Sequence, residues 1–160
     1  MKNFLDRSAY IIHRPRFFGK TFAAIVTQGF FGSKPIRKYL ELAGENLGFN
    51  IVKGSCLTTL DPMTDKQNAD LKREMAKAAE RFYKSLDQDM PPVPTLFRLM
   101  LFRMSRSGLK SYTKKYRDYY YYKENGWLES DYYYETSLSL IKKAAGLLFD
   151  YIGRVMIKHV

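Results

Sequence analysis

Apolar residues form two short runs in the first third of the chain, and a helical pattern separates them. Residues 21–26 (TFAAIV) are almost entirely apolar, which is typical of a strand covered on both faces. Residues 34–47 then space their apolar positions at helical intervals, and residues 49–57 (FNIVKGSCL) form a second run that indicates a strand. A strand, a crossover helix and another strand predict a parallel βαβ unit.

A turn with two glycines, residues 27–33 (TQGFFGS), follows the first predicted strand. Ligands of open α/β sheets bind beyond the carboxyl ends of the strands. Because the turn lies at such an end, it is the first place where we expect a functional site. Gly48 follows the predicted helix, and we expect it to adopt the left-handed conformation that commonly ends helices.

The rest of the chain reads as helical, with one clear boundary. Apolar spacing predicts helices over residues 2–12, 66–86, 96–105 and 138–159, the third of them ended by Ser107-Gly108. The proline-rich segment 90–94 predicts a stiff extended linker, which divides the chain into parts 1–90 and 91–160. The helix over residues 66–86 is expected to bury one stripe, which consists of Leu71, Met75, Ala78, Ala79, Phe82 and Leu86.

Residues 112–134 are unusually aromatic, and Asn125-Gly126 predicts a tight turn between two tyrosine clusters. A hairpin and a helix that ends at Gly126 both fit this pattern. In the last helix, Gly146 and Gly153 either permit close contact with another helix or simply weaken their own.

Charge and rare residues narrow the function classes. The net charge is +11, and residues 91–160 hold 12 Lys and Arg against 6 Asp and Glu. The lone Cys56 excludes an internal disulfide and is expected to be a small core residue, while two distant histidines predict no zinc site. With neither a signal peptide nor a transmembrane segment, we expect a cytoplasmic protein. We find no nucleic-acid motif among the basic residues.

Residues 1–7 (MKNFLDR), followed by residues 20–57, resemble the flavodoxin-like NAD(P)H-dependent FMN reductases, a group that includes iron–sulfur flavoproteins and quinone reductases. The strand and turn Ile25-Val26-Thr27-Gln28-Gly29, the pair Tyr39-Leu40 and Leu47-Gly48-Phe49 carry this resemblance. Gly126-Trp127-Leu128 and residues 131–134 look like the C-terminal extension of one subgroup. The phosphate loop and the first three strands of that family have no counterpart here.

The resemblance implies an α/β fold: part of a flavodoxin-like parallel sheet with flanking helices and a helical, aromatic-rich C-terminal extension. It implies that Thr27, Gln28, Gly29 and Phe30 contact FMN, whose electrons come from NAD(P)H and pass to a quinone or a flavin. No residue is assigned as a catalytic acid or base, because the cofactor performs the redox chemistry. On the residues alone, a turn that only connects the strand to the helix is the better explanation of Gly29 and Gly32.

Two other hypotheses remain open. A truncated member of the family is expected to have an incomplete FMN site, and the chain would then be a non-enzymatic module that oligomerises or binds a partner. The basic residues of segment 98–117 are expected to form a solvated rim or, alternatively, to lie on the surface of an anionic membrane. The tyrosines are expected to pack in a core or a subunit interface, or to stack over a flavin or a nicotinamide.

Overall fold

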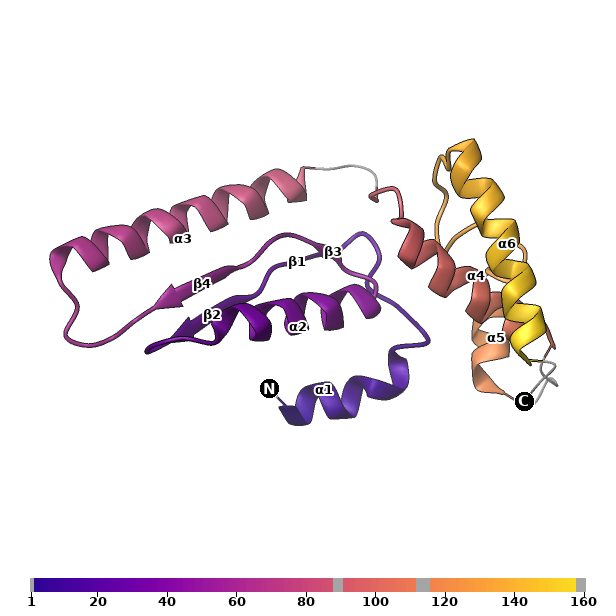
Figure 1. The fold of residues 1–160 in the computed structure, drawn as a ribbon, viewed down its shortest axis with the longest axis horizontal. Coiled ribbons are helices and arrows are strands. Elements are labelled where there is room, and N and C mark those ends of the chain that lie inside the picture. Colours follow the sequence, from indigo (N-terminus) through magenta and orange to yellow (C-terminus); the bar gives the residue numbers. More distant parts are fainter. Residues whose placement is uncertain (1, 88–90, 112–115, 158–160) are drawn as a thin grey trace. The chain divides into compact units, whose positions relative to one another are not determined.

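The computed structural model describes residues 2–87, 91–111 and 116–157. The chain divides into two compact units, Met1–Met90 and Pro91–Val160, and we describe each by itself. The N-terminal unit contains all four short strands, and the C-terminal unit contains helices α4, α5 and α6 (Figure 1). The protein is therefore of mixed α/β class.

Two parallel pairings form the centre of the N-terminal unit. Strand β1 (Thr21–Phe22) pairs with β3 (Asn50–Ile51), and β2 (Ile25–Gln28) pairs with β4 (Ser55–Thr58). Helix α2 (Ser33–Asn46) connects β2 to β3, so the predicted parallel strand–helix–strand unit is confirmed. Each predicted strand is nevertheless broken into two pieces, and the first extends to Gln28 rather than ending at Val26.

A one-residue bulge causes the break. Thr21 pairs with Asn50, 29 positions later, whereas Ile25 pairs with Ser55, 30 positions later. Residues 52–54 therefore face only two residues, 23 and 24, and the extra residue interrupts the ladder. The two segments stay in contact across the bulge, because the Ser55 amide donates to the Ala24 carbonyl oxygen at 3.0 Å.

Gly54 makes this close approach possible. A Cβ atom at Gly54 would lie 1.9 Å from the carbonyl oxygen of Ala24. The Gly54 amide donates to the Glu41 carboxylate of α2 at 2.8 Å, and Arg37 donates to the same oxygen at 2.5 Å. The bulge is thus fixed to the helix that crosses over it.

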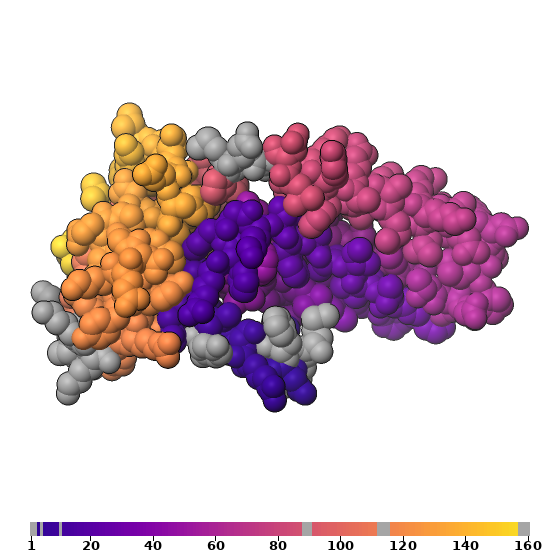
Figure 2. Space-filling view, turned by 180° about the vertical axis from the view of Figure 1, so that it is seen from behind, coloured from indigo at the N-terminus to yellow at the C-terminus, as the bar shows by residue number. Residues whose placement is uncertain are grey.

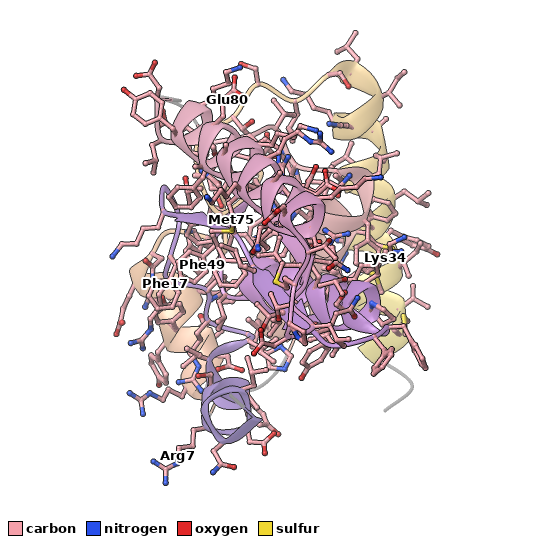
Figure 3. The ribbon with its side chains drawn as sticks, turned by 90° about the vertical axis from the view of Figure 1, so that its left-hand side faces the viewer. Arg7, Phe17, Lys34, Phe49, Met75 and Glu80 are labelled. Atoms are coloured by element: carbon pink, nitrogen blue, oxygen red, sulfur yellow. The ribbon has the colours of Figure 1, made fainter. Side chains whose placement is uncertain are left out.

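Helix α2 begins and ends with glycines in left-handed conformations. Gly32 precedes it with a φ of 104°, and Gly48 follows it with a φ of 101°, as predicted. The Phe49 amide donates to Gly44 and the Gly48 amide to Glu45, the bond pattern of a Schellman motif. The chain then enters β3 at Asn50, and Phe49, just before the strand, stacks on Phe17 with ring centroids 4.5 Å apart (Figure 3).

Helix α3 (Asp65–Leu86) lies on the other side of the strands from α2 (Figures 1 and 3). Thr64 caps it through a reciprocal capping box with Gln67. The predicted buried stripe is wrong: none of the helix residues is fully buried, and Met75 and Leu86 are exposed. The reason is the width of the sheet, because a ladder of two strands is too narrow to cover one whole side of a helix. Figure 2 shows α3 along the surface of this unit.

Helices also account for the remaining elements. At the N-terminus, α1 (Lys2–Ser8) continues into a 3₁₀ turn (Ala9–Ile11). In the C-terminal unit, α4 (Leu96–Ser111) packs along α6 (Leu140–Ile157), and α5 (Arg117–Glu124) packs on α4. The alternatives at Asn125-Gly126 are thus decided in favour of a helix that ends there. The predicted stop at Ser107-Gly108 is wrong, because both residues face inward and α4 continues through them.

We predict that Gly54→Ala destabilises the N-terminal unit by about 3 kcal/mol, because the new methyl group must displace the backbone of Ala24. Urea unfolding followed by circular dichroism measures the loss. Gly29→Ala is the matched control, since its Cβ would lie an ordinary 3.5 Å from Leu60. Equal unfolding midpoints for the two variants would contradict the role given to the bulge.

Candidate functional site

The predicted flavin-contacting residues lie at the carboxyl end of β2. Thr27 and Gln28 are the last two residues of the strand, and Gly29 and Phe30 begin the turn that leads to α2. Since β4 is parallel to β2, its carboxyl end meets the same edge, where the Thr59 amide donates to the Gln28 carbonyl oxygen at 3.0 Å. The structure thus brings all four residues together.

Gln28 holds the turn in shape. Its side-chain oxygen accepts a hydrogen bond of 2.7 Å from the backbone amide of Ser33, the first residue of α2. This bond satisfies one of the amides that a helix N-terminus leaves without an intrahelical partner. The side chain of Gln28 therefore shapes the turn, so any ligand contact is left to the backbone and to neighbouring side chains.

Two adjacent phenylalanines project from this turn. Phe30 is 78% exposed and Phe31 is 90% exposed. Neighbouring helix α2 adds Lys34 at its first turn, at the same end of the strands (Figure 3). Exposed aromatic rings beside a helix N-terminus suit a planar, anionic ligand, because the rings can stack and the helix end favours negative charge. Residues 27–34 therefore combine two exposed aromatic rings with a lysine and a helix N-terminus.

A buried charge network forms a second, unpredicted cluster, in the C-terminal unit. Asp150 of α6 accepts hydrogen bonds from three side chains of α4: Arg103 at 2.9 Å, Arg106 at 2.5 Å and Ser107 at 2.7 Å. Arg103 also contacts Asp131 at 2.5 Å, and Arg106 donates to the Ser130 carbonyl oxygen. The network ties α4, α6 and the segment after α5 together.

Two glycines let α6 approach α4 closely on either side of Asp150. A Cβ at Gly153 would lie 2.9 Å from the Cα of Met104, and one at Gly146 would lie 3.2 Å from the guanidinium of Arg103. Of the two roles left open for these glycines, close helix contact is the one that the structure shows. Burial alone would raise the pKa of Asp150, but the Ser107 hydroxyl and the nearby Arg106 guanidinium hold that pKa below its usual value.

Aromatic rings pack directly beside this network, where the guanidinium carbon of Arg106 lies 5.8 Å from the ring centroid of Phe102. Phe102, which is fully buried, contacts Tyr122, Tyr132 and Tyr133, and Trp127 packs edge-on against Tyr122. The hydroxyls of Tyr122 and Tyr133 lie 3.1 Å apart. Burial raises the pKa of Tyr122 to about 12 and raises that of Tyr133 as well. Core packing is thus confirmed for these tyrosines; Tyr112 lies outside the described residues.

An open pocket of about 460 Å³ lies beside this aromatic core. Asn125, Trp127 and residues 130–136 line it. Of its two acidic members, Asp131 is already paired with Arg103 and Glu135 is exposed. The pocket is therefore a hollow next to a structural ion pair.

Several expectations about single residues need correction. Arg103 and Arg106 are buried in the charge network rather than in a solvated rim. Cys56 is half-buried in β4, not fully buried in the core. The sequence did contain a signal for the network: Gly146, Asp150 and Gly153 share one helical face, where a lone acid between glycines indicates a tight, charged contact.

Comparison with known proteins adds no relative: no family model, curated protein or solved structure matches the chain. Within the described residues, no three His, Cys, Asp or Glu side chains gather as a metal site would need. None of the helices in those same parts of the chain is long and apolar enough to cross a lipid bilayer. Function must therefore be inferred from the residues themselves.

We predict that Asp150→Asn lowers the free energy of unfolding of the C-terminal unit by about 3 kcal/mol, because it leaves the buried Arg106 guanidinium without a counter-charge and Arg103 with Asp131 alone. Urea unfolding followed by the fluorescence of Trp127, the single tryptophan, reports on this unit alone. Asp131→Asn is the matched control and should cost less than about 1 kcal/mol, since that side chain is 60% exposed. Equal losses would contradict the central place of Asp150.

We further predict that the C-terminal unit loses stability between about pH 10 and about pH 12. In the unfolded chain a tyrosine ionises near pH 10, whereas burial holds Tyr122 neutral up to about pH 12 in the fold. The contribution of Tyr122 to stability is thus fully present below the pKa of the tyrosine in the unfolded chain. It is lost as the pH rises towards the pKa of Tyr122 in the folded protein. Replacing both Tyr122 and Tyr133 with Phe should flatten this dependence in urea unfolding, and Tyr83→Phe should not.

Proposed function

We propose that the chain is a flavodoxin-like module whose turn at residues 27–30 binds the ring edge of FMN in an NAD(P)H-dependent oxidoreductase. The supporting observation is the parallel pairing of β2 with β4, which presents the turn at the carboxyl ends of both strands. This is where open α/β sheets bind ligands, and where the resemblance to FMN reductases places a flavin contact. When bound, FMN would accept a hydride from the nicotinamide and pass electrons on to a quinone or a second flavin.

The chain's own residues would orient the ring. The backbone amides of Gly29 and Phe30 can donate hydrogen bonds to the pyrimidine edge, where negative charge develops on reduction. Gln28 keeps the turn rigid through its bond to Ser33, so these amides need little reorganisation. The exposed ring of Phe30 can cover the flavin and exclude water from it.

A second candidate function is that of a non-enzymatic module that binds a partner or a second copy of this chain. The open edge of β2 favours it. In the described part of the chain, β2 has one strand neighbour, β4, and Ile25 on it is 52% exposed. An unpaired edge is a template for another strand. A partner strand along this edge could also provide the remainder of a flavin site, so the two candidates share one surface.

We predict that the full chain binds FMN saturably, with quenching of flavin fluorescence, and that Phe30→Ala weakens binding about fivefold because it removes about 1 kcal/mol of ring stacking. The matched control is Tyr83→Ala, which removes a ring of similar exposure (74%) near the C-terminal end of α3, away from the turn. Reduction of a quinone by NADPH in the presence of FMN tests the activity.

The result that contradicts the flavin proposal is the absence of saturable binding at FMN concentrations well above those of cells. Sedimentation velocity on the same sample then tests the second candidate. A self-associating chain without flavin affinity supports the module that binds a partner, and a monomer with full flavin affinity contradicts it.

A further inference from the structure

Helix α6 carries its apolar side chains on the side that faces away from α4. The side towards α4 holds Gly146, Asp150 and Gly153, the residues of the tight, charged contact. The two helices run parallel, since Lys142 donates to the Pro94 carbonyl oxygen near the start of α4 and Gly153 meets Met104 further along (Figure 1). An ordinary helix of a globular protein buries its apolar stripe, whereas α6 exposes it.

We define the outer face of α6 as the exposed apolar residues of this helix. On a helix of 3.6 residues per turn, all but Met156 lie within an arc of about 120°. The exposed fractions range from 37% for Val155 to 84% for Leu140. The members are Leu140, Ile141, Ala144, Leu147, Leu148, Tyr151, Val155 and Met156. A continuous apolar surface of this kind marks an interaction site.

The charges on α6 indicate what kind of surface fits. Lys143 and Arg154 are exposed and border the outer face on one side. The single acidic residue of the helix, Asp150, is buried in the network with Arg103 and Arg106. The outer face is therefore apolar with two cations along one side, which is complementary to an anionic surface that has an apolar interior.

We propose that the outer face of α6 docks on an anionic lipid bilayer, with the helix lying in the plane of the membrane. The helix is not apolar and long enough to cross the bilayer, but its apolar side suits the boundary between headgroups and acyl chains. Tyr151 lies within the face, and tyrosine is enriched at that depth. Leu148 and its neighbours enter the acyl region while Lys143 and Arg154 contact lipid phosphates.

A second copy of the chain fits this face less well. Two outer faces packed together would bring Lys143 and Arg154 of each copy into one interface, and α6 has no exposed acid to pair with them. Like charges across an interface oppose association, whereas each lysine or arginine strengthens binding to anionic lipid. The basic segment 98–117 is a poorer candidate than α6, because Arg103 and Arg106 are buried.

The test is co-sedimentation of the full chain with vesicles of phosphatidylcholine, with and without phosphatidylglycerol. We expect binding to the anionic vesicles only, weakened by salt. Leu148→Glu should reduce the partition coefficient at least about tenfold, because it removes an inserted leucine and adds a repelled charge. Leu86→Glu is the matched control, since Leu86 is 58% exposed on α3 and Leu148 is 56% exposed, and it should bind as the wild type does.

A milder pair of variants tests the charge contribution separately. Lys143→Gln should weaken binding about fivefold, and Lys72→Gln on α3 should leave it unchanged. Equal binding to neutral and anionic vesicles, or equal loss in Leu148→Glu and Leu86→Glu, would overturn the proposal. So would a dimer in sedimentation velocity that Leu148→Glu dissociates while no vesicle binds, since the face would then serve self-association. Unchanged Trp127 fluorescence in each variant shows that the unit is folded.

Discussion

The parallel pairing of residues 21–28 with residues 50–58 determines the arrangement of the whole N-terminal unit. It places α2 and α3 on opposite sides of the strands and brings the ends of β2 and β4 together beside the turn at residues 27–33. The bulge at Gly54 is part of this constraint, because it lets the backbones approach and gives Glu41 an amide to accept from. A two-stranded ladder is narrow, however, so the helices around it are only half covered.

The C-terminal unit depends on a different kind of interaction. Its two long helices approach each other at two glycines and meet at a buried carboxylate. A buried ion pair gains little net stability, because both charges lose water, but it penalises any arrangement that separates them. Asp150 and the two arginines therefore select the face of α6 that turns inward. The apolar side is left outside as a direct consequence.

The sequence allowed the local elements to be predicted better than their burial. Gly48 carries its own conformational signal, so the helix end before it was correctly expected, whereas the helix that ends at Asn125-Gly126 was one of two alternatives that the sequence left open. Apolar spacing predicted where helices form but not which side faces inward, as Met75 and Leu148 show. That choice depends on the width of the neighbouring sheet and on tertiary ion pairs, and neither is encoded within one helix. For the same reason the network around Asp150 could not be found by looking for apolar stripes.

Each unit exposes one surface that could bind a partner, and the two surfaces offer different kinds of interaction. The open edge of β2 presents backbone donors and acceptors, which are directional and are satisfied by another strand in register. The outer face of α6 presents apolar area, which is non-directional and needs no partner of particular shape. A protein strand therefore suits the first surface and a fluid bilayer suits the second. Since the charged border of α6 adds a preference for anionic lipid, loss of membrane binding should leave any strand pairing at β2, and any flavin bound beside it, unaffected.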